Sequence, residues 1–222
     1  MTARTQGLVA ALLGAVLLRL ALTGEYLRFV LPWMKWPLLA TGLALLVMGA
    51  RPLLGRGIAG VVPSSAWLLL VPPLVVFAIT PQPLGAYLAE RRPAQPPQRP
   101  AHVQQVDRGA PEPVRVGVDE FVWGAAQVDD VMGLAGTTVQ LDGFVSTDPQ
   151  GHWYVSRMVI FCCAADALVQ RVEVVGPPAP RRDQWVRVTG VWVDGTGLDF
   201  DEEPQITAER IVRIPEPKAP YG

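Results

Sequence analysis

The sequence predicts an α-helical membrane region in residues 1–90, a linker in residues 91–113 and a mainly β domain in residues 114–222. Long apolar segments fall before residue 90, whereas short runs of alternating apolar residues fall after residue 113. The charge changes at nearly the same place. Residues 1–100 hold nine basic and two acidic residues, a net charge of +7, and residues 101–222 hold ten basic and 18 acidic residues, a net charge of −8. Such an asymmetry is typical of chains that interact with membranes or charged partners.

Three apolar segments, 7–22, 29–50 and 66–88, predict about three membrane-spanning helices. A spanning helix needs about 20 mostly apolar residues. The second segment meets this length directly. The other two meet it when Arg19 and Tyr87 lie at the membrane surface, where long and amphipathic side chains reach the headgroups. A core helix of a soluble domain is the alternative, but segment 29–50 has no polar face.

Basic residues predict the orientation of these segments. Arg4 precedes the first segment, and Arg51 and Arg56 lie in the loop between the second and third, which holds no acidic residue. Because basic residues prefer the cytoplasmic side, three spans place the β domain outside the cytoplasmic membrane. Arg91 and Arg92, after the third segment, favour the opposite orientation. A third segment that only lies on the membrane would also leave the β domain in the cytoplasm.

The linker 91–113 is rich in proline and polar residues, which predicts an extended, semi-rigid spacer. Within 118–136 we expect a short strand and a helix that ends at Gly136. Alternating apolar residues and turn-rich breaks then predict five strands, at 137–145, 152–161, 171–176, 185–194 and 205–214. Five short strands and one helix predict a small barrel of the oligonucleotide/oligosaccharide-binding (OB) type. A β-sandwich is the alternative fold.

Both cysteines of the chain, Cys162 and Cys163, are adjacent in "MVIFCCAADALVQ", and Asp166 follows them. Adjacent cysteines hold their sulfurs in poor geometry for a disulfide. If this stretch starts a helical turn, Asp166 shares a face with both of them. Two thiolates and a carboxylate suit a zinc or copper ion, and His152 is the candidate for a further ligand. His102 is a weaker candidate because it lies in the linker.

A structural interpretation of the same residues competes with metal or thiol chemistry. Free cysteine is among the most buried residue types, so one cysteine is expected to pack in the barrel core and the other to lie in a crevice. Asp166 then caps the helical turn, as aspartate often does. A third interpretation makes the stretch a surface for a partner. Adjacent cysteines are not a recognised zinc spacing, so the sequence leaves all three interpretations open.

Other functional classes find little support in the residues. The chain holds no Gly-rich phosphate loop and no Ser/His/Asp set in a suitable context, so no enzyme is expected. The acidic run 199–203 matches no calcium loop. A domain with a net charge of −8 repels phosphate backbones, so we expect no nucleic-acid partner.

Several motifs spread along the chain together resemble the YcgQ-type family of bacterial membrane proteins. They are "LTGEYLRFVLPWMKWPL", "WLLLVPPLVVFAITPQPLGAYLAERR", "LAGTTVQLDGFV", "RMVIFCCAADA", "WVRVTGVW" and "PQITAERI". The resemblance implies N-terminal spans, a C-terminal domain of unknown function and a gene beside a multi-span permease. Many members carry a histidine-rich run in the loop before the last span. Here that loop is "RPLLGRGIAGVVPSS" and holds no histidine.

This resemblance implies a non-enzymatic accessory subunit of a bacterial membrane permease system, connected with metal supply. We expect a multi-pass protein of the cell membrane that contacts lipid and a multi-span permease. Its OB-like domain would contact the partner or a ligand. The alternative is a metal-binding or thiol-redox membrane protein that uses Cys162, Cys163 and Asp166.

Overall fold

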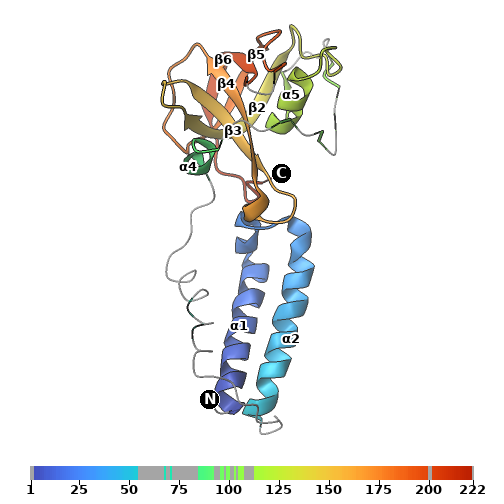
Figure 1. Cartoon of the computed structure of the whole chain (residues 1–222), viewed down its shortest axis with the longest axis vertical. Coiled ribbons are helices and arrows are strands. Elements are labelled where there is room, and N and C mark those ends of the chain that lie inside the picture. The colour runs from blue at the N-terminus through green and yellow to red at the C-terminus, as the bar shows by residue number, and fades with distance from the viewer. Residues whose placement is uncertain are drawn as a thin grey trace. The chain divides into compact units, whose positions relative to one another are not determined.

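The computed structural model describes residues 3–54, 68, 71, 85–92, 96–97, 99–100, 103, 105–107, 113–199 and 202–221. The chain divides into two units, Met1–Pro83 and Leu84–Gly222 (Figure 1). Of the third predicted span, 66–88, most lies outside the described residues.

The first unit contains two long apolar helices, α1 (Ala3–Thr23) and α2 (Lys35–Leu53). Short 3₁₀ turns at Glu25–Arg28 and Pro32–Met34 join them. Helix α1 ends where Gly24 adopts a left-handed conformation with φ 80°, which glycine does at little cost. The predicted segment 7–22 lies inside α1, and α2 covers most of the predicted segment 29–50; residues 29–31 are not helical. Proline is well tolerated in a first helical turn, which suits the 3₁₀ turn that begins at Pro32, before α2.

Helices α1 and α2 pack side by side through small residues (Figure 1). A Cβ atom added at Gly14 would lie 2.6 Å from the carbonyl oxygen of Gly42, and one added at Gly49 would lie 2.6 Å from that of Gly7. The two backbones therefore approach too closely for a side chain at these positions, as in close-packed membrane helices.

The outer faces of the two helices remain apolar and exposed. Only 22% of the apolar window in α1 and 11% of that in α2 is buried, whereas a core helix of a soluble protein is mostly buried. Exposed large side chains are Leu8, Leu12, Trp36, Leu43, Val47 and Met48. By length and composition, both helices could cross a membrane, although a signal sequence near an N-terminus meets the same criterion.

The second unit contains a mixed six-stranded sheet. Its strands are β1 (Val114–Val116), β2 (Thr138–Thr147), β3 (Trp153–Val159), β4 (Leu168–Val175), β5 (Trp185–Trp192) and β6 (Gln205–Arg213). The strand order is β1-β2-β3-β4-β6-β5, and β2 pairs with β5 as well. The pairings therefore run in a ring from β2 through β3, β4, β6 and β5 back to β2. The β1–β2 and β4–β6 pairs are parallel, and the others are antiparallel.

Helix α5 (Val118–Ala125) covers part of this sheet (Figure 1). Its start is capped by Glu120, whose carboxylate accepts the N–H of Gly117 at 2.9 Å. The helix buries one apolar face in a cluster with side chains from the strands, including Phe121, Val122, Leu141, Val155, Val172, Val188 and Ile206. The alternation of apolar residues along the strands thus produces one continuous core.

The predicted helix end at Gly136 is wrong, because α5 stops at Ala125. The side chain of Asp130 explains the loop that follows. Its carboxylate accepts the backbone N–H groups of Leu134 at 2.7 Å and Ala135 at 3.0 Å, which stabilises a turn in place of a continued helix.

Two further boundaries differ from the expectation. Val106, in the predicted linker 91–113, is 6% exposed in the core, and its N–H donates to the carbonyl of Met132 at 2.7 Å. Residues 86–88, expected at the end of the third span, form the start of α4 (Ala86–Ala89), which belongs to the second unit and contacts β2. Small alanine side chains let this turn pack closely, and Ala86 and Ala89 are fully buried.

Candidate functional site

The two cysteines lie in the connection between β3 and β4. Strand β3 ends at Val159, β4 begins at Leu168, and a single 3₁₀ turn at Ala164–Asp166 lies between them. Cys163 precedes this turn in an extended conformation with φ −152°. The sequence predicts this arrangement of a strand end followed by a helical turn.

Asp166 holds the cysteine turn together through its carboxylate. Oδ1 accepts the N–H of Phe161 at 3.0 Å, and Oδ2 accepts those of Cys162 at 2.9 Å and Cys163 at 3.4 Å. These donors have no helical partner at the start of a turn, so the carboxylate acts as a cap. The capping role considered for Asp166 is therefore present.

Neither cysteine is buried, so the expected packing of one cysteine in the core is not found. Cys162 is exposed and Cys163 is half-buried, and both are free. One ligand atom from each of Cys162, Cys163 and Asp166 lies within 4.8 Å of the others. Within the described part of the chain, this is the one group of three or more His, Cys, Asp or Glu residues with such spacing.

His152 lies on another turn, in a hydrogen-bonded group of its own. Its Nδ1 lies 2.9 Å from Oδ2 of Asp148, which also accepts the hydroxyl of Tyr154 at 3.0 Å. The hydrogen bond to Asp148 raises the pKa of His152 above its usual value. The structure thus does not group His152 with the cysteines, and His102, the weaker candidate, lies outside the described residues.

The acidity of Cys162 depends on Asp166. Hydrogen bonding to the Asp166 carboxylate, and then to Cys163, raises the pKa of the Cys162 thiol to about 12. The same hydrogen bond lowers the pKa of Asp166. At neutral pH Cys162 is therefore a thiol and a weak nucleophile, because the thiolate is the reactive form. A metal ion must displace the proton before it can bind this sulfur.

Asp166 keeps one lone-pair site for a metal ion. A carboxylate offers about four such sites, and three backbone N–H groups already use Asp166. The fourth site accepts the Cys162 thiol, but that proton leaves when a metal binds the sulfur. The turn can therefore offer the two sulfurs and one carboxylate lone pair without losing a backbone hydrogen bond.

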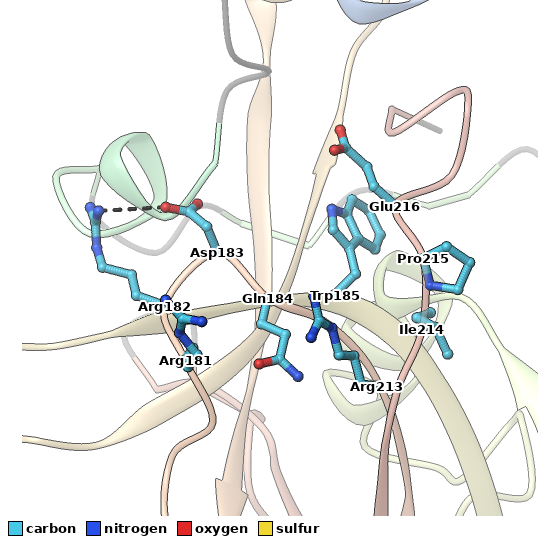
Figure 2. A pocket seen from close by; sticks show the side chains of 9 residues that line it. All are labelled: Arg181, Arg182, Asp183, Gln184, Trp185, Arg213, Ile214, Pro215 and Glu216. Carbon is cyan, nitrogen blue, oxygen red and sulfur yellow. Dashed lines mark hydrogen bonds and ion pairs between the residues drawn. The ribbon is translucent and has the colours of Figure 1, made fainter.

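A second feature, which the sequence analysis did not find, is an open cavity of about 620 Å³ (Figure 2). It lies between the loop before β5 and the residues after β6. It is lined by Arg181, Arg182, Asp183, Gln184, Trp185, Arg213, Ile214, Pro215 and Glu216. The adjacent arginines at 181 and 182 are the local signal that could have pointed to it.

Residues 112–222 match the DUF1980 C-terminal domain. The chain belongs to this family. DUF1980 C-terminal domains form an uncharacterised family, and the matched range contains all six strands, the cysteine turn and the cavity. No curated protein matches the chain. The family assignment therefore covers the β domain and brings no substrate or partner with it.

Proposed function

We propose that this DUF1980 protein is a non-enzymatic accessory subunit of a bacterial membrane permease system. In this proposal it is a multi-pass protein of the cell membrane, with the β domain on the extracytoplasmic side. The apolar outer faces of α1 and α2 carry the proposal, because their large side chains are exposed in the described residues and suit contact with lipid or with another membrane helix. The proposed partners are membrane lipid and a multi-span permease.

The β domain is proposed as an OB-like barrel that contacts the partner or a ligand. The ring of strand pairings from β2 back to β2 supports closure of the sheet. The parallel β4–β6 pair and helix α5 also suit this fold, whose members bind ligands and partners on a strand face and its adjoining loops. Such a module needs no catalytic residues.

Affinity purification of the full-length tagged protein from detergent-solubilised membranes tests the partnership. We expect a multi-span membrane protein to be recovered with it. A matched variant, Leu43→Ala/Val47→Ala, trims the exposed face of α2 and should recover less of that protein. If the parent chain recovers no multi-span protein, it is not a stable subunit of a permease complex.

The side of the membrane can be measured with a single introduced cysteine. Val128 is 93% exposed in the β domain, and the chain has only two native cysteines. In a Cys162→Ser/Cys163→Ser background, a cysteine at position 128 should react with a membrane-impermeant maleimide added to intact cells. Labelling that occurs only after permeabilisation places the domain in the cytoplasm, which means either that segment 66–88 is not a span or that three spans have the opposite orientation.

A metal-binding or thiol-redox function is the second candidate. It is favoured by the three ligand atoms within 4.8 Å of one another on an accessible turn. Metal analysis of the purified full-length protein should detect zinc or copper that is lost in Cys162→Ser/Cys163→Ser. His152→Gln is the matched control, and it should keep the metal because this residue pairs with Asp148. Equal metal content in the parent and the double variant would exclude the cysteines as ligands.

A further inference from the structure

We propose that the cavity beside Trp185 binds a phosphate group, carried either by a lipid headgroup or by free phosphate. The cavity holds about 620 Å³ and is open, so a headgroup can enter it from solvent. This affinity does not depend on the accessory-subunit proposal, because all of its lining residues lie within the second unit.

Positive charge gathers at this cavity although the domain is acidic. Residues 114–222 hold nine basic and 16 acidic residues, yet three of the nine line the cavity, namely Arg181, Arg182 and Arg213. Arginine presents a planar set of donors that fits the oxygens of phosphate and carboxylate groups. An anion is therefore the class of ligand that these walls favour.

Two of the three arginines are available to a ligand. Arg182 is already engaged by Glu90, with Nε–Oε1 at 2.9 Å and Nη2–Oε2 at 2.8 Å. Among the described residues, the guanidinium groups of Arg181 and Arg213 form no ion pair or hydrogen bond. By contrast, Arg171 and Arg187 each pair with a carboxylate. Arg181 and Arg213 therefore bring two unpaired guanidinium groups to the same cavity.

The wall of the cavity is held in place by its remaining residues. Asp183 contacts Arg182 at 3.5 Å and accepts the N–H of Ala86 at 2.6 Å. In Figure 2 the side chain of Gln184 lies between those of Arg181 and Arg213, so its amide adds a donor beside the two cations. The contacts of Asp183 fix one part of the wall, and donors already in position lower the entropic cost of binding.

Glu216 limits the charge that the cavity can accept. In Figure 2 its carboxylate lies on the other side of the Trp185 side chain from Gln184, and both residues line the cavity. With Arg181 and Arg213 unpaired, the groups free to meet a ligand carry a net charge of about +1. A singly charged phosphate diester, whose headgroup hydroxyls can donate to Glu216, fits this balance better than a polyphosphate.

The position of α4 favours a lipid as the source of the phosphate. Helix α4 begins within the last residues of the third predicted span. Its first residue, Ala86, bonds to the cavity residue Asp183, and Glu90, directly after the helix, bonds to Arg182. If the preceding segment crosses the membrane, the chain leaves the bilayer beside the cavity, where lipid phosphates are concentrated. This step rests on the membrane anchoring proposed above, whereas the phosphate affinity itself does not.

Calorimetry on the full-length protein in a non-ionic detergent tests the site at fixed ionic strength. The probes are inorganic phosphate, short-chain phosphatidylglycerol and, as an uncharged control, diacylglycerol of the same chain length. Loss of two charge-assisted contacts in Arg181→Gln/Arg213→Gln should weaken phosphate binding about tenfold or more. The matched variant Arg210→Gln/Lys218→Gln removes the same charge from exposed positions outside the cavity. It should change the affinity less than about twofold, because surface charges are screened.

The outcomes separate the two sources and the two proposals. Binding of phosphatidylglycerol without measurable binding of inorganic phosphate assigns a lipid headgroup, and comparable binding of both assigns free phosphate. The site is refuted if the parent binds neither probe. It is also refuted if the cavity variant keeps the parent's affinity, or if both double variants lose it equally. Unfolding temperatures of both variants within about 2 °C of the parent confirm that folding is retained. If affinity purification recovers no permease, the phosphate binding measured by calorimetry should remain, so the two proposals fail independently.

Discussion

The reactivity of Cys162 should increase when Asp166 is replaced by asparagine. The carboxylate holds the pKa of Cys162 at about 12, against an ordinary value of 9.0. At pH 8 an ordinary thiol is about one tenth thiolate, whereas a pKa of 12 leaves about one part in ten thousand. This difference is roughly a thousandfold in the reactive form. Because Cys162 is exposed, solvent screening reduces the effect, and we expect Asp166→Asn to accelerate alkylation by at least about tenfold.

The assay uses Cys163→Ser as its background, because Cys162 is then the only thiol in the chain. The rate of iodoacetamide addition is followed by mass spectrometry from pH 7 to pH 10 in the full-length protein. The same variant in denaturant supplies the reference rate of an unperturbed thiol. Asp148→Asn is the control, because that carboxylate contacts His152 and Tyr154 on another turn. Equal rates for the folded and denatured chains, or for Cys163→Ser with and without Asp166→Asn, would contradict the role of the carboxylate.

Three further outcomes are expected. Gly14→Leu should lower the unfolding temperature in detergent, since even its Cβ would lie 2.6 Å from the backbone of α2, whereas Leu43→Ala, on the exposed face, should not. Gly143→Ala should destabilise the β domain by about 1–3 kcal/mol in chemical denaturation, since its Cβ would lie 2.6 Å from a carbonyl oxygen of β3. His152 should titrate by NMR above its ordinary pKa of 6.5 and return toward it in Asp148→Asn. Its contribution to stability is therefore present below pH 6.5 and is lost as the pH rises through the folded-state pKa.

The strands that the sequence predicts correctly are those with several alternating positions. Residues such as Val139, Leu141 and Val145 in β2 share the buried side of one long strand, so the period of two is visible without the fold. Strand β1 has three residues and pairs in parallel with a strand more than 20 positions away, so no local pattern marks it. The helix end was missed for a similar reason, because Asp130 competes with the helix through side-chain hydrogen bonds.

The two candidate sites also differ in whether they join neighbouring or distant residues of the chain. The cap by Asp166 joins residues that are three to five positions apart, so the spacing alone suggested it. The cavity joins the loop before β5 to the end of β6, and the contacts of α4 with its wall span more than 90 positions. Such a site depends on strand order, which a single sequence does not reveal. His152 was assigned to the cysteines by residue type, while its acidic neighbour at i−4 gave the better local indication.

The number of donors at the cysteine turn decides which metal it could hold alone. If Asp166 keeps its three backbone hydrogen bonds, the turn offers two adjacent sulfurs and one carboxylate lone pair, and the described residues add no further His, Cys, Asp or Glu ligand to this group. Structural zinc takes four ligands, so a closed zinc site would need one more from a second protein. Soft thiolate ligands select copper(I) as well as zinc, and two sulfurs without a fourth protein ligand suit copper(I) better. The isolated protein should therefore retain copper more tightly than zinc, and zinc binding should strengthen when the partner is present. Zinc binding by the isolated chain that is as tight as copper binding, and unchanged by the partner, would contradict this argument.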